Sequence, residues 1–590
     1  MPDGLKSEAR GPLRAAVPEG RRLGRHVALW IGLLVCLWFL FPKHVGQIWL
    51  LEGPRRMPVT LPWFAPREHG AQTLEMMLLK PIERLSVRTK DCEAGLEMGG
   101  RGAVSARPGT GWLAGYALWG LPGRIAPGGK TLRFTVRNAG PEAWFDLKEA
   151  HGLTGLKVLG LLVWGLGAFA LARRCGYGLW PGWPVALAGL LAVQYLDVTT
   201  PWVRQHDVGG HSEYIEHLRV YRELPAVLQG WETWQPPLYY CIAAAWQRLW
   251  PGGAYDDPFR PVQFLGAALY LAAVVAALLA FRRLGLTELE AAGGLCALVL
   301  LPGNLFFAGR INNDVLLPVL GAGVMFSTAE IVRTGQRRWR WWLAILLPAV
   351  LATKGSSLAM VGGALSLVMW AEARRSGWRP ALWQTYLTGL PALIWQLAWC
   401  WRAGAQTGNP LYVNATLLPE NMRLYGSAWS RLLSFNFPAF LGGGFCYDEP
   451  VRQSYPTALV TTLLYGEYDM REYGFRWPEL LRWGCLGLLL LMAAGALVAP
   501  RARLRSVWMT CLVLAGCQIA ITTTYAIQFP FSCNQNMRFF AQAFVPLCCL
   551  SGLGLGHFWH GAGWVGRGAV FVMVGAFLLG LADFYLRVLV

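Results

Sequence analysis

Charged residues are scarce in this chain of 590 residues. They make up 15% of the sequence, whereas apolar residues reach 54% and tryptophan occurs 30 times. An ordinary soluble domain carries about 25% charged residues. This shortage of charge excludes a soluble globular protein, and the apolar content excludes a disordered chain. Most of the chain is therefore expected to lie in a bilayer, where burying a charge is costly.

Acidic residues and metal-binding cysteine patterns are also scarce. The chain has 53 basic and 34 acidic residues, so its formal charge is 53 − 34 = +19. In a membrane protein such an excess marks cytoplasmic loops rather than a nucleic-acid partner. The 13 cysteines include no CxxC or His/Cys spacing typical of zinc sites. Among those expected outside the membrane, Cys446 and Cys533 leave a disulfide open as one possibility.

Thirteen apolar runs approach the length of a membrane span. Arginine clusters fall in alternate loops, so the positive-inside rule places the N-terminus in the cytoplasm and the C-terminus outside. Residues 236–250 are apolar but short, and a crossing there would invert the pattern, so they are predicted to form an interfacial helix on the outer face. The predicted spans are 27–41, 154–172, 180–197, 260–281, 287–305, 314–332, 340–354, 356–372, 381–400, 479–499, 506–526, 538–557 and 567–587.

The long segment 44–152 is predicted to form an external β-sandwich. Leu132, Phe134 and Val136 alternate with polar residues, and Gly and Pro clusters separate the strand-like stretches. The run 125–145 resembles the late strands of galactose-binding-like jelly rolls, so the domain either binds a glycan or serves as a structural module. The remaining organisation is a basic cytoplasmic segment 1–26, a retained anchor 27–41, a module 154–400 with external loops 198–259, 306–313 and 353–357, an external region 401–478, and C-terminal helices 479–590.

A carboxylate marks the outer end of the third predicted span. Asp207 precedes Gly209 and Gly210, and residues 211–228 are predicted to form an amphipathic helix. A charge at the membrane edge is costly unless it is paired or functional. Asp207 could therefore act as a general base or bind a divalent cation, or it could simply cap the helix.

Three further polar features are predicted on the same face. Arg310 and Asp314 are four residues apart in a loop and could pair. Lys354 stands in a tight Lys-Gly-Ser-Ser turn whose cation, hydroxyls and free N–H groups suit a phosphate. Arg538 lies at the outer edge of the twelfth span. An ordinary loop, a solvated turn and a snorkelling arginine are the alternatives. Together, acidic and cationic groups on one face suit a sugar linked to a lipid phosphate.

In their order along the chain, these motifs resemble the GT-C superfamily of polytopic glycosyltransferases. The resemblance is to its family 39-like branch, the protein O-mannosyltransferase and aminoarabinose transferase group. The motifs match over roughly residues 180–360. The final third of the chain matches only in the arrangement of its loops and spans. The landmarks are Asp207 with its polar helix, the PPLYY segment 236–240, the R-x-N-N-D loop 310–314 and the Lys354 turn.

The resemblance implies a GT-C-like fold of about 13 transmembrane helices in the plasma membrane. It also implies a polyprenyl-phosphate sugar donor, an extracytoplasmic glycan, lipid or protein acceptor, and no nucleotide at the chemical step. The implied catalytic residues are Asp207, Glu232 and His211, and Asp207 with Glu232 could hold a divalent metal ion. Gln235 stands where many relatives have His or Lys, which leaves the metal contact open. The implied substrate-binding residues are Tyr239, Arg310, Asn313, Asp314, Lys354, Ser356, Arg402 and Arg538.

Two other functions stay open from the sequence. A transporter or flippase of a lipid-linked glycan should bury ionisable groups near the membrane midplane. Here the predicted spans carry few acidic residues and the charges gather at one rim, which favours chemistry at the interface. A non-catalytic cell-envelope protein that binds glycans is the third possibility, and it would not depend on Asp207.

Overall fold

The computed structural model describes most of the chain from residue 46 to residue 589. The predicted cytoplasmic segment 1–26 and the predicted first span 27–41 lie outside the described residues. Side chains are described from residue 159 onward. The gaps are 53–54, 60–62, 65–70, 79–81, 91, 99–100, 107–115, 126–130, 139–143, 150–154, 200, 202–206, 251–257, 414–417, 419, 468–477, 499–503 and 562.

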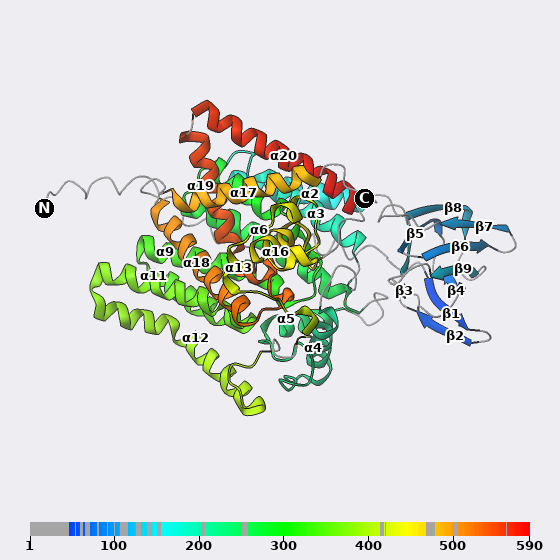
Figure 1. Ribbon diagram of the computed structural model, residues 1–590, viewed down its shortest axis with the longest axis horizontal. Helices are drawn as coiled ribbons and strands as arrows, with labels where there is room; N and C mark the ends of the chain where they lie inside the picture. Colours follow the sequence, from blue (N-terminus) through cyan, green and yellow to red (C-terminus); the bar gives the residue numbers. More distant parts are fainter. Residues whose placement is uncertain are drawn as a thin grey trace.

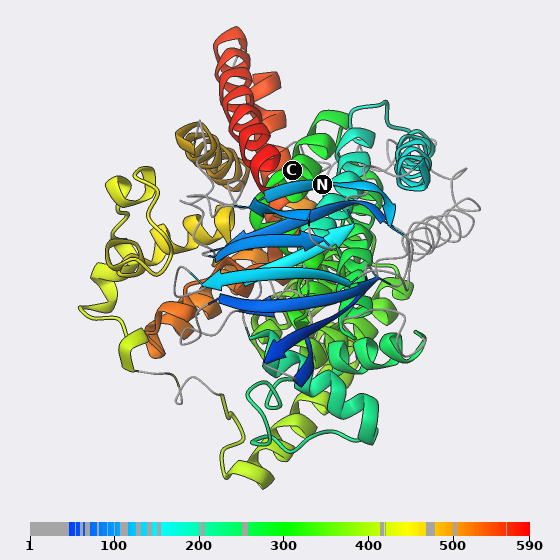
Figure 2. The ribbon, with the colours of Figure 1, turned by 90° about the vertical axis from the view of Figure 1, so that its right-hand side faces the viewer.

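The N-terminal segment folds as two antiparallel sheets that lie beside the helical body (Figures 1 and 2). One sheet has the strand order β2-β1-β4-β9-β6-β7, and the other has the order β3-β10-β5-β8. The packing of the two sheets as a sandwich stays a prediction. The strands are β1 Gly46–Glu52, β2 Arg55–Val59, β3 Trp63–Phe64, β4 Ala71–Leu78, β5 Ile82–Lys90, β6 Cys92–Met98, β7 Arg101–Ala106, β8 Tyr116–Ile125, β9 Thr131–Asn138 and β10 Trp144–Glu149.

The rest of the described chain is helical. The α-helices are α2 Gly155–Arg174, α3 Gly182–Val198, α4 Val208–Tyr221, α5 Leu238–Arg248, α6 Arg260–Leu284, α7 Glu288–Leu300, α8 Pro302–Phe306, α9 Leu317–Thr334, α10 Arg337–Thr353, α11 Leu358–Ser376, α12 Trp378–Thr407, α13 Ala428–Leu433, α14 Phe437–Leu441, α15 Glu449–Arg452, α16 Tyr455–Tyr465, α17 Pro478–Leu497, α18 Arg505–Gln528, α19 Phe544–Gly561 and α20 Gly563–Leu589. Short 3-10 helices are η4 Phe307–Gly309, η5 Asn313–Leu316, η6 Gly355–Ser357, η8 Glu420–Met422, η11 Ser532–Asn534 and η12 Met537–Ala543.

Seven helical segments among the described residues are long and apolar enough to cross a membrane, and α7 with α8 and η4 could make an eighth span bent by 60°. The chain is thus a polytopic helical membrane protein, and the count of thirteen crossings stays a prediction. The seven segments are Arg260–Leu284, Asn313–Thr334, Gly355–Ser376, Pro478–Leu497, Arg505–Gln528, Ser532–Gly561 and Gly566–Tyr585.

Helix α19 lies at the centre of the bundle because glycines on two of its faces admit neighbouring backbones. A Cβ atom added at Gly552 would lie 2.1 Å from the carbonyl oxygen of Glu290 on α7. A Cβ atom at Gly554 would lie 1.9 Å from the carbonyl oxygen of Leu491 on α17. Small residues allow this close approach of helices in a bilayer. The bundle therefore packs tightly around the helix that follows η12.

Helices α9, α10 and α11 direct polar groups toward one end of the bundle. Asp314 lies in η5, which leads into α9, while Lys354 and η6 join the end of α10 to the start of α11. The prediction of two short helices separated by Lys354 and Gly355 is confirmed. Figure 1 shows α4 and α5 on the side of the bundle toward the strands.

Several predicted boundaries were wrong. The amphipathic helix predicted over 211–228 runs from Val208 to Tyr221, because Arg222 adopts a left-handed conformation and the residue before Pro225 is disfavoured in a helix. The ninth predicted span, 381–400, extends over Trp378–Thr407, so Arg402 is helical rather than part of a loop. By contrast, the short helix predicted over 236–250 is present as α5, with 11 residues, and its interfacial position stays a prediction. Cys446 and Cys533 form no disulfide with each other in the structure, so this possibility left open by the sequence is wrong.

Candidate active site

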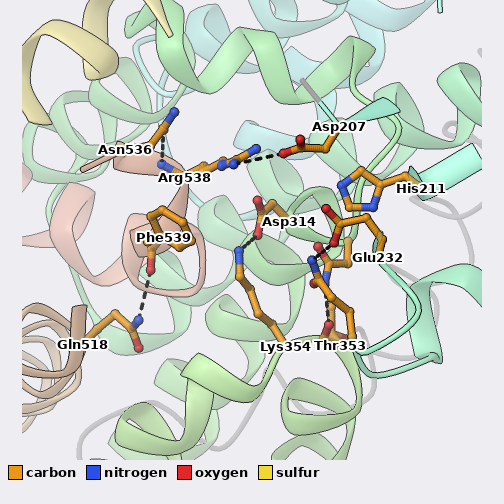
Figure 3. Close-up of polar contacts among 12 residues, drawn as sticks. Asp207, His211, Glu232, Asp314, Thr353, Lys354, Gln518, Asn536, Arg538 and Phe539 are labelled. Carbon is orange, nitrogen blue, oxygen red and sulfur yellow. Dashed lines mark hydrogen bonds and ion pairs between the residues drawn. The ribbon is translucent and has the colours of Figure 1, made fainter. Parts of the chain in front are cut away.

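Asp207 occupies the residue before α4 and directs its carboxylate away from that helix. Its backbone is left-handed, with φ 58°, a conformation that Asp tolerates better than most residues. Its side chain makes no capping hydrogen bond. Instead, Oδ2 lies 3.4 Å from Nη2 of Arg538, and the Asp207 side chain is 36% exposed (Figure 3). The alternative that Asp207 is only a helix cap is therefore wrong.

Arg538 links Asp207 to a second, buried carboxylate. Its Nη1 lies 3.8 Å from Oε2 of Glu467, and Glu467 also accepts a hydrogen bond of 2.9 Å from the Tyr447 hydroxyl. The backbone of Arg538 is fixed in η12, where its N–H donates to Oδ1 of Asn536 at 2.8 Å. The Arg538 guanidinium is thus oriented from both sides, with only 12% of its side chain exposed.

Lys354 pairs with Asp314, and this pair joins the end of α10 to η5. Asp314 takes Lys354 as its ion-pair partner instead of Arg310, which the spacing had suggested. The ring of Phe539 lies beside both cations, since Lys354 Nζ is 4.8 Å and Arg538 Cζ is 5.5 Å from its centroid. The carbonyl of Phe539 accepts a hydrogen bond of 3.0 Å from Gln518, so the ring has a fixed support.

A line of amides connects Glu232 to the end of α10. Gln235 donates to the Glu232 carboxylate, and Asn313 donates both to Gln235 and, at 2.8 Å, to the carbonyl of Thr353. Glu232 lies against Gly210, where an added Cβ would be 2.9 Å from Glu232 Cγ. Burial, with the nearby charge of Asp207, raises the pKa of Glu232 to about 8. Glu232 is therefore mostly a neutral carboxyl near pH 7.

His211 and Tyr239 lie behind these groups. His211 is 3% exposed, and its Nδ1 lies 2.8 Å from the Tyr240 hydroxyl. Burial lowers the pKa of His211 to about 3, so its ring is neutral. The adjacent Tyr239 is fully buried, with its ring edge-on to that of Tyr240. This packing supports α4 against α5 and gives both residues a positioning role.

The remaining predicted residues divide into two groups. Arg310 is 4% exposed, lies over Phe307 and lines a small pocket together with Arg538 and Asn536. Ser356 lies in η6, two residues after Lys354. Arg402 is not brought to the cluster, because it donates to the carbonyl of Pro225 and stacks over Trp399 at 4.7 Å. Arg402 thus holds the loop before α5.

The two carboxylates proposed as metal ligands are engaged by protein groups. Asp207 pairs with Arg538, and Glu232 accepts from Gln235 and is largely neutral near pH 7. A neutral carboxyl is a poor ligand for a divalent cation. Among the residues that the structure describes, no group of three His, Cys, Asp or Glu side chains could hold a metal ion. Metal dependence stays a prediction of the resemblance.

Sequence reasoning missed Phe539, Glu467 and Tyr447. Phe539 directly follows Arg538, so the Arg-Phe pair was a usable signal. Glu467 and Tyr447 come from a long polar region with many acidic and aromatic residues, and nothing in their spacing distinguishes them. Their place in the site depends on the fold of α16 and the segments beside it.

Solved structures similar to this chain include glycosyltransferases of the GT-C superfamily. ArnT from Cupriavidus metallidurans bound to undecaprenyl phosphate matches at 16% identity, over 66% of this chain and 78% of that one, with a TM-score of 0.30. The same protein in the apo state matches at 15% identity, over 63% and 78%, with a TM-score of 0.32. Arabinosyltransferase EmbB from Mycobacterium smegmatis matches at 10% identity, over 93% and 66%, with a TM-score of 0.24.

ArnT and EmbB are GT-C enzymes, the superfamily that the sequence motifs resemble. The TM-scores are too low for a correspondence between individual residues, so the roles of residues rest on the geometry of this chain. No protein-family model and none of the curated proteins matches the sequence.

Proposed function

We propose that this protein is a membrane glycosyltransferase that transfers a sugar from a polyprenyl-phosphate donor to an acceptor on the outer face. One observation carries the proposal. An accessible carboxylate, Asp207, pairs with Arg538, and Arg538 and Lys354 both lie close to the same aromatic ring, that of Phe539. The order of motifs in the sequence, which resembles the family 39-like transferases, supports the same donor class.

The two cations suit the leaving group. A polyprenyl phosphate departs more easily when cations compensate its developing charge. Lys354 and Arg538 are each 12% exposed on their side chains, so a phosphate near them would be largely shielded from water. Arg538 has five N–H donors and can hold a phosphate while keeping a contact to Glu467. We therefore propose that the donor phosphate binds next to these two cations, near the Phe539 ring.

Asp207 is the proposed general base. It takes the proton of the acceptor nucleophile as that atom forms a bond to the anomeric carbon, and the bond from that carbon to the phosphate oxygen breaks. The electron pair leaves with the phosphate. Protonation of Asp207 would weaken its ion pair with Arg538, which frees the guanidinium for the departing phosphate. Glu232, being neutral, can orient the acceptor or sugar by a hydrogen bond.

The decisive test replaces Asp207 by Asn. Purified protein is incubated with a membrane extract of its host that supplies both lipid-linked sugars and acceptors, and transfer of sugar from the lipid to an acceptor is followed by mass spectrometry. We expect Asp207→Asn to lower turnover by ~10²–10⁴, the usual contribution of a general base, and to retain polyprenyl phosphate. Glu213→Gln is the matched control, because Glu213 is an exposed carboxylate on α4, the helix that Asp207 directly precedes. Unchanged transfer by Asp207→Asn would refute the assignment.

A further inference from the structure

Seven arginines gather at the end of the bundle opposite Asp314 and Lys354. Helix α9 has 18 residues and so extends about 27 Å, at 1.5 Å per residue, from the site to this end. Over residues 330–379, leaving aside Lys354 at the other end, seven arginines face only two carboxylates, giving 7 − 2 = +5. This end of α11 and α12 lies on the far side from the strands in Figure 1. The arginines are Arg333, Arg337, Arg338, Arg340, Arg374, Arg375 and Arg379.

Three of these arginines form ion pairs with the two carboxylates of this region. Arg333 pairs with Glu330, while Arg340 and Arg375 lie 2.9 Å and 3.3 Å from Glu372. Both glutamates are buried. The Arg340–Glu372 pair joins α10 to α11, the other two pairs lie within α9 and within α11, and together they account for both carboxylates of this region.

The other four arginines contact tryptophan instead of carboxylates. The guanidinium carbons lie 4.4–5.8 Å from indole ring centroids. Within the part of the chain that the structure describes, none of the four has an ion pair. The pairs are Arg337 with Trp341, Arg338 with Trp339, Arg374 with Trp370 and Arg379 with Trp378.

Three of the four tryptophans, Trp341, Trp370 and Trp378, are exposed, whereas Trp339 is partly buried against Phe326. Trp341 is 62% exposed and Trp378 is 63% exposed. Tryptophan is enriched at the headgroup level of a membrane, where its apolar body and polar N–H are both satisfied. An arginine stacked on such a ring keeps its N–H donors free in a fixed plane, and this geometry matches a phosphate bidentately.

We propose that these four Arg–Trp pairs form a binding surface for the headgroups of anionic phospholipids. The term Arg–Trp surface refers here to Arg337, Arg338, Arg374 and Arg379 with their four tryptophans. A generally basic inner face attracts anionic lipids without preference among loops. The Arg–Trp surface differs from a generally basic face in two ways. Its guanidinium groups form no ion pair with a carboxylate among the described residues, and each lies against an indole ring. Arg173 and Arg174, at the end of α2, are equally exposed but are stacked on no ring in the described chain.

Native mass spectrometry of the full chain tests the surface. The protein is released from bilayers with equal parts of phosphatidylglycerol and phosphatidylcholine that carry identical acyl chains. We expect preferential retention of phosphatidylglycerol, and a loss of about fivefold for each arginine removed. R337Q/R338Q and R374Q/R379Q should therefore both reduce the preference strongly. R173Q/R174Q removes the same charge from another loop and should leave the preference unchanged.

A second variant separates stacking from charge. W378L keeps every arginine but removes the ring under Arg379, so it should reduce the preference less than R374Q/R379Q. Equal retention of the two lipids by the unaltered protein would overturn the proposal. It would also be overturned if R173Q/R174Q lowered the preference as much as R374Q/R379Q, because the charge effect would then be general. All variants change exposed side chains, and their thermal unfolding serves as a check on folding.

Discussion

The protonation of Glu232 offers a sharp test of the site. Burial raises its pKa from 4.5 to about 8, and its neighbour Gln235 donates a hydrogen bond to it. Glu232→Gln keeps an oxygen that can accept this bond and cannot ionise. At low pH, where Glu232 is neutral in the folded and unfolded states, the variant should be as stable as the natural protein.

The magnitude follows from the raised pKa. A carboxyl whose folded pKa lies above its unfolded value stabilises the fold fully below about pH 4.5, and this contribution is lost as the pH rises through about 8. Each pH unit in this window is worth about 1.4 kcal/mol, so the whole window is worth about 5 kcal/mol. The natural protein should lose this stability relative to Glu232→Gln as the pH rises.

Thermal unfolding in detergent is measured for both proteins between about pH 5 and about pH 9, and the difference between them isolates Glu232. Infrared difference spectroscopy measures the proton directly, because a neutral carboxyl has a carbonyl band that disappears on ionisation. That band should titrate near pH 8 in the natural protein and be absent from Glu232→Gln. Parallel stability profiles, or a carboxyl already ionised at about pH 6, would show that the reasoning about burial is wrong.

Three other perturbations test the cations and the loop. Lys354→Met should destabilise the protein by about 3–5 kcal/mol, since it leaves Asp314 buried and unpaired; adding Asp314→Asn should restore thermal stability but not polyprenyl-phosphate binding. Phe539→Leu should weaken polyprenyl-phosphate binding by ~5–30-fold, because it removes the ring that contacts both cations. Its melting temperature should not change. Full retention of affinity would show that the ring does not hold the two cations for the phosphate. Arg402→Gln should increase hydrogen exchange around Pro225 with little change in phosphate affinity, and a large drop in affinity would instead favour the direct phosphate contact that the family resemblance implied.

Local patterns in the sequence predicted local structure well. The alternation around Phe134 gave β9, and the turn at Lys354 correctly separated α10 from α11. The end of α4 was missed because it depends on the left-handed backbone of Arg222, which no apolar periodicity reveals. Residues 402–407 are polar or small, so hydropathy alone could not place Arg402 inside a helix.

The residues of the site were easier to predict than the ion pairs that they form. Asp207, Lys354, Asp314 and Arg538 were all identified as candidates, but Lys354 and Asp314 are 40 residues apart and Asp207 and Arg538 are 331 apart. Such contacts depend on how the bundle closes, not on spacing. The short spacing from Arg310 to Asp314 pointed to the wrong pair, because the backbone is extended at Arg310 and Asn312, between η4 and η5, so no single α-helix carries both residues.

The backbone at the two ends of α4 constrains how the site can be dissected by mutation. Within the described residues, Asp207 and Arg222 are the only residues other than glycine with positive φ. An alanine at position 207 would add about 1 kcal/mol of backbone strain to the loss of charge, whereas asparagine tolerates the left-handed region. Alanine scanning would therefore confuse a displaced helix with a missing base. Arg222→Gly, which relaxes the other end without touching the carboxylate, would report how much of any such effect comes from the helix alone.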